Sequence, residues 1–402
     1  MIKPPISRKF VAEAAILFCV FLDLCGFGMV LSDVQLRAQR LMPHGVPTGL
    51  VIGLILASTF VVQSLVSPLW GKLADRRGRK PVFLICTILS ALAMTVYGLG
   101  DRIEFVFASR IVAGFGGANV AMAQAYVAEW FKGPSRTAAF GRIGAAVSAG
   151  LIAGPVLGGW MAHRFGSLSM AHVAAGFSFL GVAFGLVALP RDRVIEKVES
   201  EKRAGRRRLL SEFPKVRPLF MIAVVAWSSL ALLEGTFARL IHALFGYDQL
   251  QFGILMGFEA TVGFLVQTWL LVLISRRYAS RRVLFWGYLL QGVGLALNPV
   301  AGIWAALVPP LAVLLVASFL FAIGVSVSNP TVSSLATAIV PEERHGELMG
   351  LMQAARSAGF VAGPALGGAF FDWSPSGPYY FAGLICIMAA GLVLWTRAGA
   401  AT

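Results

Sequence analysis

The chain has 402 residues, of which 57% are hydrophobic and only 13% are charged. A soluble domain carries about 25% charged residues, so this composition excludes an ordinary soluble protein and favours a chain dissolved in lipid. The net charge of +15 does not indicate a nucleic-acid partner, because the basic residues lie between apolar runs and form no stripe along one of them.

Apolar runs long enough to cross a bilayer recur along the whole chain. One helical span needs about 20 residues, and we therefore expect an all-α polytopic membrane protein with twelve transmembrane helices. The first run contains Glu13 and Asp23 and no cleavage pattern follows it, so we expect it to be retained as a membrane helix. The runs lie near residues 10–31, 47–70, 81–99, 103–128, 138–160, 169–189, 218–244, 250–275, 282–304, 308–338, 346–371 and 377–396.

The distribution of Lys and Arg predicts the orientation of these helices. With the N-terminus in the cytoplasm, the inner segments hold 27 of the 34 basic residues and the outer loops hold four, Arg37, Arg40, Arg102 and Arg164. Because basic residues concentrate on the cytoplasmic side of membrane proteins, we expect both termini in the cytoplasm and the chain in the cell (inner) membrane.

One long polar stretch divides the twelve runs into six and six. Residues 190–217 are expected to form a cytoplasmic linker, in part helical, at the anionic lipid surface. The predicted domains are therefore an N-terminal six-helix half at 1–189 and a C-terminal six-helix half at 218–402.

An internal repeat supports two related halves. Residues 141–159 and 350–368 are identical at twelve of nineteen positions with a constant offset of 209. Glycines spaced four apart let helices approach closely, and proline softens a helix. Parallel halves related by pseudo-twofold symmetry are a transporter architecture with a substrate site near mid-membrane. The matched residues are Gly150, Gly154, Pro155, Gly158 and Gly159 with Gly359, Gly363, Pro364, Gly367 and Gly368.

Four stretches of the chain resemble motifs of the major facilitator superfamily, and more closely of its twelve-helix drug:proton antiporter branch, which includes tetracycline and multidrug exporters. GKLADRRGRKP at 71–81 is similar to the loop between the family's second and third helices, and GLIAGPVLGG at 150–159 to its antiporter motif. SRIVAGFGGA at 109–118 and FLDLCGFGM at 21–29 are similar to further helix motifs.

The chain also departs from the family pattern. Ser32 and Gln35 stand where a pair of prolines is usual, with an additional Asp33, and the second-half counterpart of the loop, SRRYASRR at 275–282, lacks the acid and the glycines. The runs 81–99 and 282–304 contain no carboxylate, which weakens tetracycline as the substrate.

The loop motif is interpreted as a conformational latch. Gly71 and Gly78 are expected to permit a tight turn with positive φ. The resemblance implies that Asp75 lies against the N-terminal end of the run 346–371, near 342–346, which would favour the outward-open state. It also implies that Arg79 pairs with Glu129. The predicted latch comprises Gly71, Asp75, Arg76, Gly78, Arg79 and Glu129; a plain topology anchor is the alternative.

Charged groups within spans are costly and usually functional. We expect Asp23 to carry a coupled proton, modulated by Arg110, with Glu234 or Glu259 as a second titrating or cation-binding group. The resemblance implies that Asp23 and Arg110 face a central cavity, where they could pair. A static ion pair between two helices is the alternative. The buried amides Gln124, Gln291 and Asn329 are candidates for substrate contact.

The predicted function is secondary active transport: proton-coupled efflux, by antiport and alternating access, of small amphipathic compounds or drugs. The alternatives are a proton-coupled or facilitative metabolite transporter, or a lipid or lysolipid flippase. We expect no enzyme, metal or cofactor, because the sequence has no metal-spaced His/Cys set, P-loop or nucleophile elbow. The expected partners are the small-molecule substrate, protons and membrane lipids, without nucleic acid, and the chain is expected to be a monomer.

Overall fold

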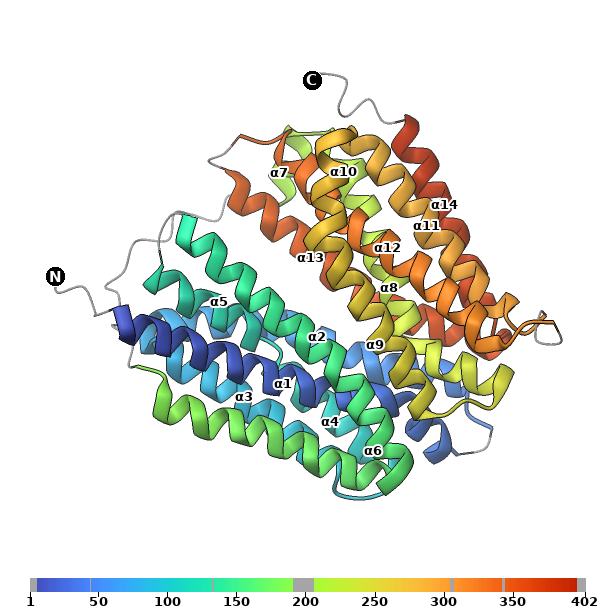
Figure 1. Ribbon diagram of the computed structural model, residues 1–402, viewed down its shortest axis with the longest axis horizontal. Helices are drawn as coiled ribbons and strands as arrows, with labels where there is room; N and C mark the ends of the chain where they lie inside the picture. Colours follow the sequence, from blue (N-terminus) through green and yellow to red (C-terminus); the bar gives the residue numbers. More distant parts are fainter. Residues whose placement is uncertain are drawn as a thin grey trace. The chain divides into compact units, whose positions relative to one another are not determined.

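The computed structural model describes residues 6–43, 45–131, 134–190, 206–303, 307–341 and 344–395, and these are helical almost throughout (Figure 1). No strand occurs in these ranges. The first part of the chain forms α1 (Ile6–Leu41), α2 (Thr48–Arg77), α3 (Arg79–Tyr97), α4 (Ile103–Gly116), α5 (Asn119–Trp130) and α6 (Pro134–Ala188). The second part forms α7 (Arg206–Glu212), α8 (Val216–Phe245), α9 (Gln249–Leu265), the π-helical turn η1 (Val266–Leu270), α10 (Leu271–Arg277), α11 (Ser280–Val300), α12 (Pro310–Thr337), α13 (His345–Trp373) and α14 (Gly377–Trp395).

Each of the twelve predicted runs is helical over most of its described residues, which confirms the all-α polytopic fold. Ten of the described helices are long and apolar enough to cross a membrane by length and composition. The long α6 combines the predicted runs 138–160 and 169–189, which meet at Gly166 with a φ of 83°. The run 103–128 is divided into α4 and α5, and the run 346–371 corresponds to the 29-residue α13.

The end of α1 differs from the prediction. Arg37 and Arg40 were expected in an outer loop, but α1 continues to Leu41 and both lie within its last two turns. The physical reason is that this part of the helix is covered by protein, because Asp33 and Arg37 are both buried. Polar side chains that are bonded inside the protein do not have to end a membrane helix.

The described helices form two compact units. Unit 1 consists of residues 1–44, 58–199 and 248–257, and unit 2 of residues 45–57, 200–247 and 258–402. The helices α2 and α9 are therefore shared, since each begins in one unit and continues in the other. In unit 1, α1 packs along α6, and in unit 2, α13 packs along α8.

The short helix α7 is attached to unit 2. Its Leu209 is buried in an apolar cluster with residues of α8 and α13. Arg344, directly before α13, donates hydrogen bonds to Glu212 of α7 and to Glu347, the latter at 2.7 Å. These bonds raise the pKa of Arg344 above its usual range, so the contact persists as an ion pair at neutral pH.

Candidate functional site

The repeated glycines set the closest helix contacts in both units. In unit 1, a Cβ on Gly150 would lie 2.8 Å from the Leu24 side chain, and one on Gly154 would lie 2.5 Å from the carbonyl oxygen of Cys25. Gly158 approaches the backbone of Met29 in the same way. Only glycine allows α6 to lie this close to α1.

The matching glycines of unit 2 have the same role. A Cβ on Gly359 would meet the backbone of Trp227 and Ser228, and one on Gly363 would lie 2.5 Å from the Ser228 carbonyl oxygen. Gly367 faces Leu232. The repeat therefore places α13 on α8 as it places α6 on α1. Of the charged candidate residues, Asp23 lies on α1 and Glu234 lies on α8.

The carboxylate of Asp23 is bound by uncharged hydrogen-bond donors. It is 3% exposed, on the stretch of α1 that packs on α6. Its Oδ1 accepts a hydrogen bond from Ser178 Oγ at 3.0 Å, and its Oδ2 accepts one from Asn119 Nδ2 at the start of α5. The two oxygens are satisfied without a cation, so the carboxylate is held in place while its charge is not neutralised.

Arg110 does not pair with Asp23 among the described side chains. Its Nε donates to the adjacent Ser109 Oγ at 3.3 Å, and its Nη2 is buried without a hydrogen-bond partner. Its guanidinium carbon is 5.7 Å from the centre of the Tyr97 ring. The predicted Asp23–Arg110 pair is therefore not present in the structure, because Asn119 and Ser178 donate the hydrogen bonds to the carboxylate of Asp23.

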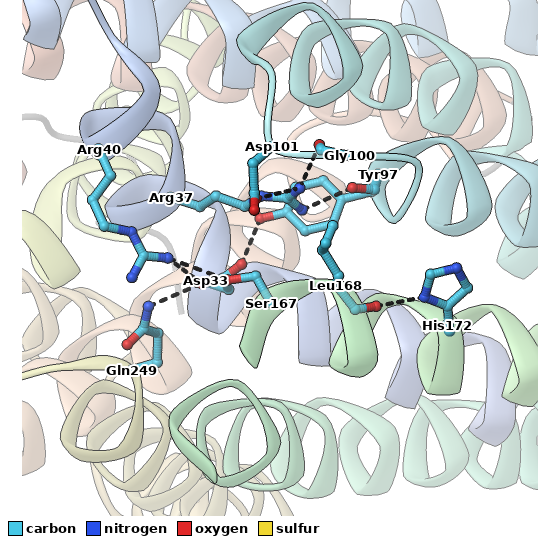
Figure 2. A network of polar contacts seen from close by, with 10 residues as sticks. All are labelled: Asp33, Arg37, Arg40, Tyr97, Gly100, Asp101, Ser167, Leu168, His172 and Gln249. Carbon is cyan, nitrogen blue, oxygen red and sulfur yellow. Dashed lines mark hydrogen bonds and ion pairs between the residues drawn. The ribbon is translucent and has the colours of Figure 1, made fainter. Parts of the chain in front are cut away.

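A second buried carboxylate, Asp33, has more partners than Asp23. Figure 2 shows Asp33, which lies two to three turns further along α1, surrounded by side chains from several helices. It accepts hydrogen bonds from Tyr97 Oη at 2.8 Å, Ser167 Oγ at 2.9 Å and Gln249 Nε2 at 3.0 Å. Arg40 approaches it to 3.7 Å.

Arg37 extends this network towards the end of α3. Its guanidinium donates to the carbonyl oxygens of Tyr97 at 2.7 Å and Gly100 at 2.8 Å, and to Asp101 Oδ1 at 3.2 Å. It also lies 4.4 Å from the centre of the Tyr97 ring (Figure 2). We did not assign Asp33 or Arg37 a role from the sequence, although their i, i+4 spacing on one helix face was a usable signal.

One candidate acid of unit 2, Glu234, interacts with an arginine. The charges of Glu234 and Arg356 act on each other, and the charge of Glu234 also acts on Glu259. Glu259 is 9% exposed, and its Oε1 has no hydrogen-bond partner in the described part of the chain. The Arg356 guanidinium lies 4.9 Å from the Trp227 ring centre and 5.5 Å from that of Phe360. Arg356 was not included in the predicted site.

The three candidate amides have different environments. Gln291 is fully buried, donates to Ser229 Oγ at 2.7 Å and accepts from Ser328 Oγ at 3.4 Å. Its hydrogen bonds are thus used between helices of unit 2, which argues for packing and against substrate contact. Gln124 is exposed and Asn329 is half-buried, so both stay predicted contacts.

The predicted latch is described only in part. Gly78 has a φ of 92° and separates α2 from α3, as expected, but Gly71 lies inside α2 and makes no turn. The expectation for Gly71 is wrong because α2 continues to Arg77. Asp75 and Arg76 are exposed on the last turns of α2.

Other contacts of this latch remain predictions. The side chain of Glu129 and residues 342–343 lie outside the described part of the chain. Arg79 Nη1 donates to the carbonyl oxygen of Ala125 at 2.8 Å, near the end of α5. A cation near a helix C-terminus is favourable. The bond from Arg79 to Ala125 therefore connects α3 to α5 independently of the predicted pair with Glu129.

Comparison with known proteins gives one family. The model of the Major Facilitator Superfamily matches residues 15–297 and 270–401. The chain is 25% identical to "Multidrug resistance protein 1" of Bacillus subtilis (strain 168), over 98% of both chains. It is 27% identical to "Tetracycline resistance protein, class D" of Salmonella ordonez, over 87% of both.

Solved structures show the same fold. The nucleoside transporter NupG matches with a TM-score of 0.74 at 15% identity, over 96% of this chain and 97% of that one. The human organic anion transporter MFSD10 matches with a TM-score of 0.68 at 20% identity, over 97% and 100%. At these identities the likeness concerns the fold alone.

Proposed function

Because the chain belongs to the Major Facilitator Superfamily, we propose that it exports small amphipathic compounds or drugs in exchange for protons, by alternating access. The names of its relatives support export of drugs, since they include multidrug, tetracycline and quinolone resistance proteins. We also infer that it is a transporter and not an enzyme.

The observation that carries the proposal is the environment of Asp23. An ionised carboxylate within a membrane-spanning segment is costly and is usually functional. Asn119 and Ser178 satisfy the oxygens of Asp23 but bring no positive charge. A proton is the natural species to neutralise such a group, and its release restores the ionised form that the two donors stabilise.

The acids of unit 2 are proposed as a second charge-bearing site. Glu259 keeps one buried oxygen without a partner, and Glu234 lies in the field of Arg356. A cationic group of a substrate, or a second proton, would provide the charge that Glu259 lacks. The rings of Trp227 and Phe360 beside Arg356 would add apolar contact for the rest of an amphipathic compound.

The orientation is part of the proposal. We propose that the protein lies in the inner membrane with its N- and C-termini in the cytoplasm. This orientation puts 27 of the 34 basic residues on the cytoplasmic side. An ion gradient then supplies the energy, and each elementary charge that crosses contributes about 2.3 kcal/mol per 100 mV.

The test is efflux from vesicles that contain the purified protein. A panel of dyes and antibiotics is loaded, a pH gradient is imposed, and proton release on substrate addition is followed. We expect gradient-dependent efflux from the parent and loss of proton release from Asp23→Asn. Glu104→Gln, an exposed acid in the first turn of α4, is the matched control. Undiminished proton release from Asp23→Asn rejects the role of Asp23, and efflux without a gradient rejects proton exchange.

A further inference from the structure

A break between α4 and α5 brings an amide side chain to Asp23. Gly117 and Ala118 separate the two helices, and Asn119 begins α5. The carbonyl oxygen of Gly117 accepts a hydrogen bond from Gln63 Nε2 of α2 at 2.6 Å. A Cβ on Gly117 would lie 2.7 Å from the same Gln63 side chain, so α2 packs closely on the break. The break is therefore fixed within unit 1, and α2 supplies a donor for a carbonyl group at the end of a helix.

Two hydrogen bonds hold the amide of Asn119 in one orientation. Its Oδ1 accepts from the backbone N–H of Val120 at 2.7 Å, in the first turn of α5, where N–H groups have no acceptor within the helix. Its Nδ2 donates to Oδ2 of Asp23. Rotating the amide by half a turn would direct its oxygen at the carboxyl group and take the acceptor from Val120. In this orientation Asn119 acts towards Asp23 as a donor alone.

The other partners of Asp23 are hydroxyl groups. Ser178 on α6 is fully buried and donates to Oδ1 at 3.0 Å, and Ser90 on α3 is a third hydrogen-bond partner of the carboxyl group. A hydroxyl group can both donate and accept, and its hydrogen rotates to suit the neighbour. A serine oxygen can therefore accept a proton bound to the carboxyl group, whereas the amide N–H of Asn119 can only donate.

Charged neighbours contribute little to this site. In the described part of unit 1, the titratable groups whose charges interact with that of Asp23 are the thiols of Cys19 on α1 and Cys86 on α3. Free thiols are largely neutral at pH 7. Arg110 on α4 makes no described hydrogen bond to Asp23, since its Nε donates to the neighbouring serine. The uncharged donors on α3, α5 and α6 are therefore the groups that distinguish the two charge states of Asp23.

We propose that Asn119 is the positioning residue for the coupled proton: it keeps Oδ2 of Asp23 as an acceptor in both charge states, and the proton is carried on Oδ1, where Ser178 accepts it. A protonated carboxyl oxygen is a donor, so the oxygen that faces the fixed amide N–H stays unprotonated. On release, the O–H bond at Oδ1 breaks, its electron pair stays on the carboxylate, the proton passes to water, and Ser178 rotates back to donate. The inference rests on the proposed function, because it concerns the proton that Asp23 is proposed to carry.

The experiment is infrared difference spectroscopy of purified protein, titrated with acid in the absence of substrate. The carbonyl band of protonated Asp23 is assigned by its loss in Asp23→Asn. Asn119→Leu keeps a similar volume without a donor and is expected to move this band to higher frequency. It is also expected to raise the pH midpoint of the band by about one unit, because a hydrogen bond to an ionised acceptor is about twice as strong as one to a neutral acceptor.

Three further variants complete the design. Asn119→Ser, whose side chain is one bond shorter and can still accept a hydrogen bond at the start of α5, is expected to change the band in the same direction. Ser178→Ala removes a donor from the ionised form and an acceptor from the protonated form, so its midpoint is expected to move less than that of Asn119→Leu. Asn298→Leu, at a buried asparagine of α11 in unit 2, is the matched control and is expected to leave band and midpoint unchanged.

The proposal is overturned if band and midpoint stay at the parent values in a folded Asn119 variant, or if Ser178→Ala raises the midpoint as far as Asn119→Leu does. If neither Asn119 variant is recovered as folded protein, Ser178→Ala decides, since a rise of a full unit would show that Ser178 acts only as a donor. A band that ignores Asn119 leaves the proposed function intact. If no band is lost in Asp23→Asn, Asp23 carries no proton, and the proposed function fails together with this inference.

Discussion

Replacement of Asp33 is expected to destabilise the protein more than replacement of any single partner. Its carboxylate accepts from Tyr97, Ser167 and Gln249 at 2.8 to 3.0 Å, and Arg40 lies 3.7 Å away (Figure 2). Asp33 itself is fully buried. Its loss therefore leaves donors from three other elements without an acceptor.

The magnitude follows from the number and kind of these bonds. A hydrogen bond to a charged group contributes about 1.5–3 kcal/mol, and one between neutral groups about 0.5–1.5 kcal/mol. In Asp33→Asn the bonds from Ser167 and Gln249 can persist on the amide oxygen, and the Tyr97 hydroxyl must become the acceptor of the amide N–H. All three bonds are then neutral, so we expect a loss of about 3 kcal/mol. Asp33→Ala leaves three donors unsatisfied and is expected to cost more than about 4 kcal/mol, whereas Tyr97→Phe removes one bond and is expected to cost about 1–2 kcal/mol.

The assay is thermal unfolding of purified variants in one detergent, followed by intrinsic fluorescence. The expected order of midpoints is parent, then Tyr97→Phe, Asp33→Asn and Asp33→Ala. Glu104→Gln, which replaces an exposed acid in the first turn of α4, is expected to lose no more than about 1 kcal/mol. Because Asp33 and Tyr97 share a bond, the double variant should lose less than the sum of the single losses. Equal midpoints for Asp33→Asn and the parent, or strict additivity with Tyr97→Phe, would refute the reasoning.

Three further predictions follow from the glycines and the loop motif. Gly154→Val is expected to destabilise the protein by at least about 1–3 kcal/mol, because the valine side chain would collide with the backbone of α1. Gly144→Val, with open space around it, is the control in the same unfolding assay. Gly78→Ala should lose about 1 kcal/mol at its φ of 92°, while Gly71→Ala, inside α2, should lose nothing. Asp75→Asn should shift the inward and outward populations measured by spin-label distances while the topology is retained; unchanged populations would leave the loop as an anchor alone.

The helices and the repeat were predictable because the bilayer restricts the choices. Every backbone polar group in the membrane must be satisfied within the segment, so apolar runs of about 20 residues become helices. Likewise, the twelve identities between 141–159 and 350–368 correspond to the same close packing, with Gly154 on Cys25 and Gly363 on Ser228. Both patterns are local in the chain.

The partners of buried polar groups were not predictable, because they are distant in sequence. Asp33 bonds Gln249, which is 216 residues away, and Asp23 bonds Ser178, which is 155 residues away. The resemblance implied that Asp23 and Arg110 could pair across a cavity, whereas the neutral side chains of Asn119 and Ser178 bind the carboxylate. The pattern of charges in a sequence does not identify which of several buried donors binds a given carboxylate in the folded protein.

The loss of the glycines from the second-half loop has a geometric explanation. In the first half a single residue, Gly78, connects α2 to α3, and it needs a φ of 92°. In the second half two residues, Tyr278 and Ala279, connect α10 to α11, with φ of −125° and −58° and ψ near 140°. These are extended conformations open to any residue, so glycine is not required there. The difference in glycines between the two loops is therefore explained by backbone geometry. The remaining difference that concerns a latch is the acid Asp75, and the Asp75→Asn experiment tests that residue directly.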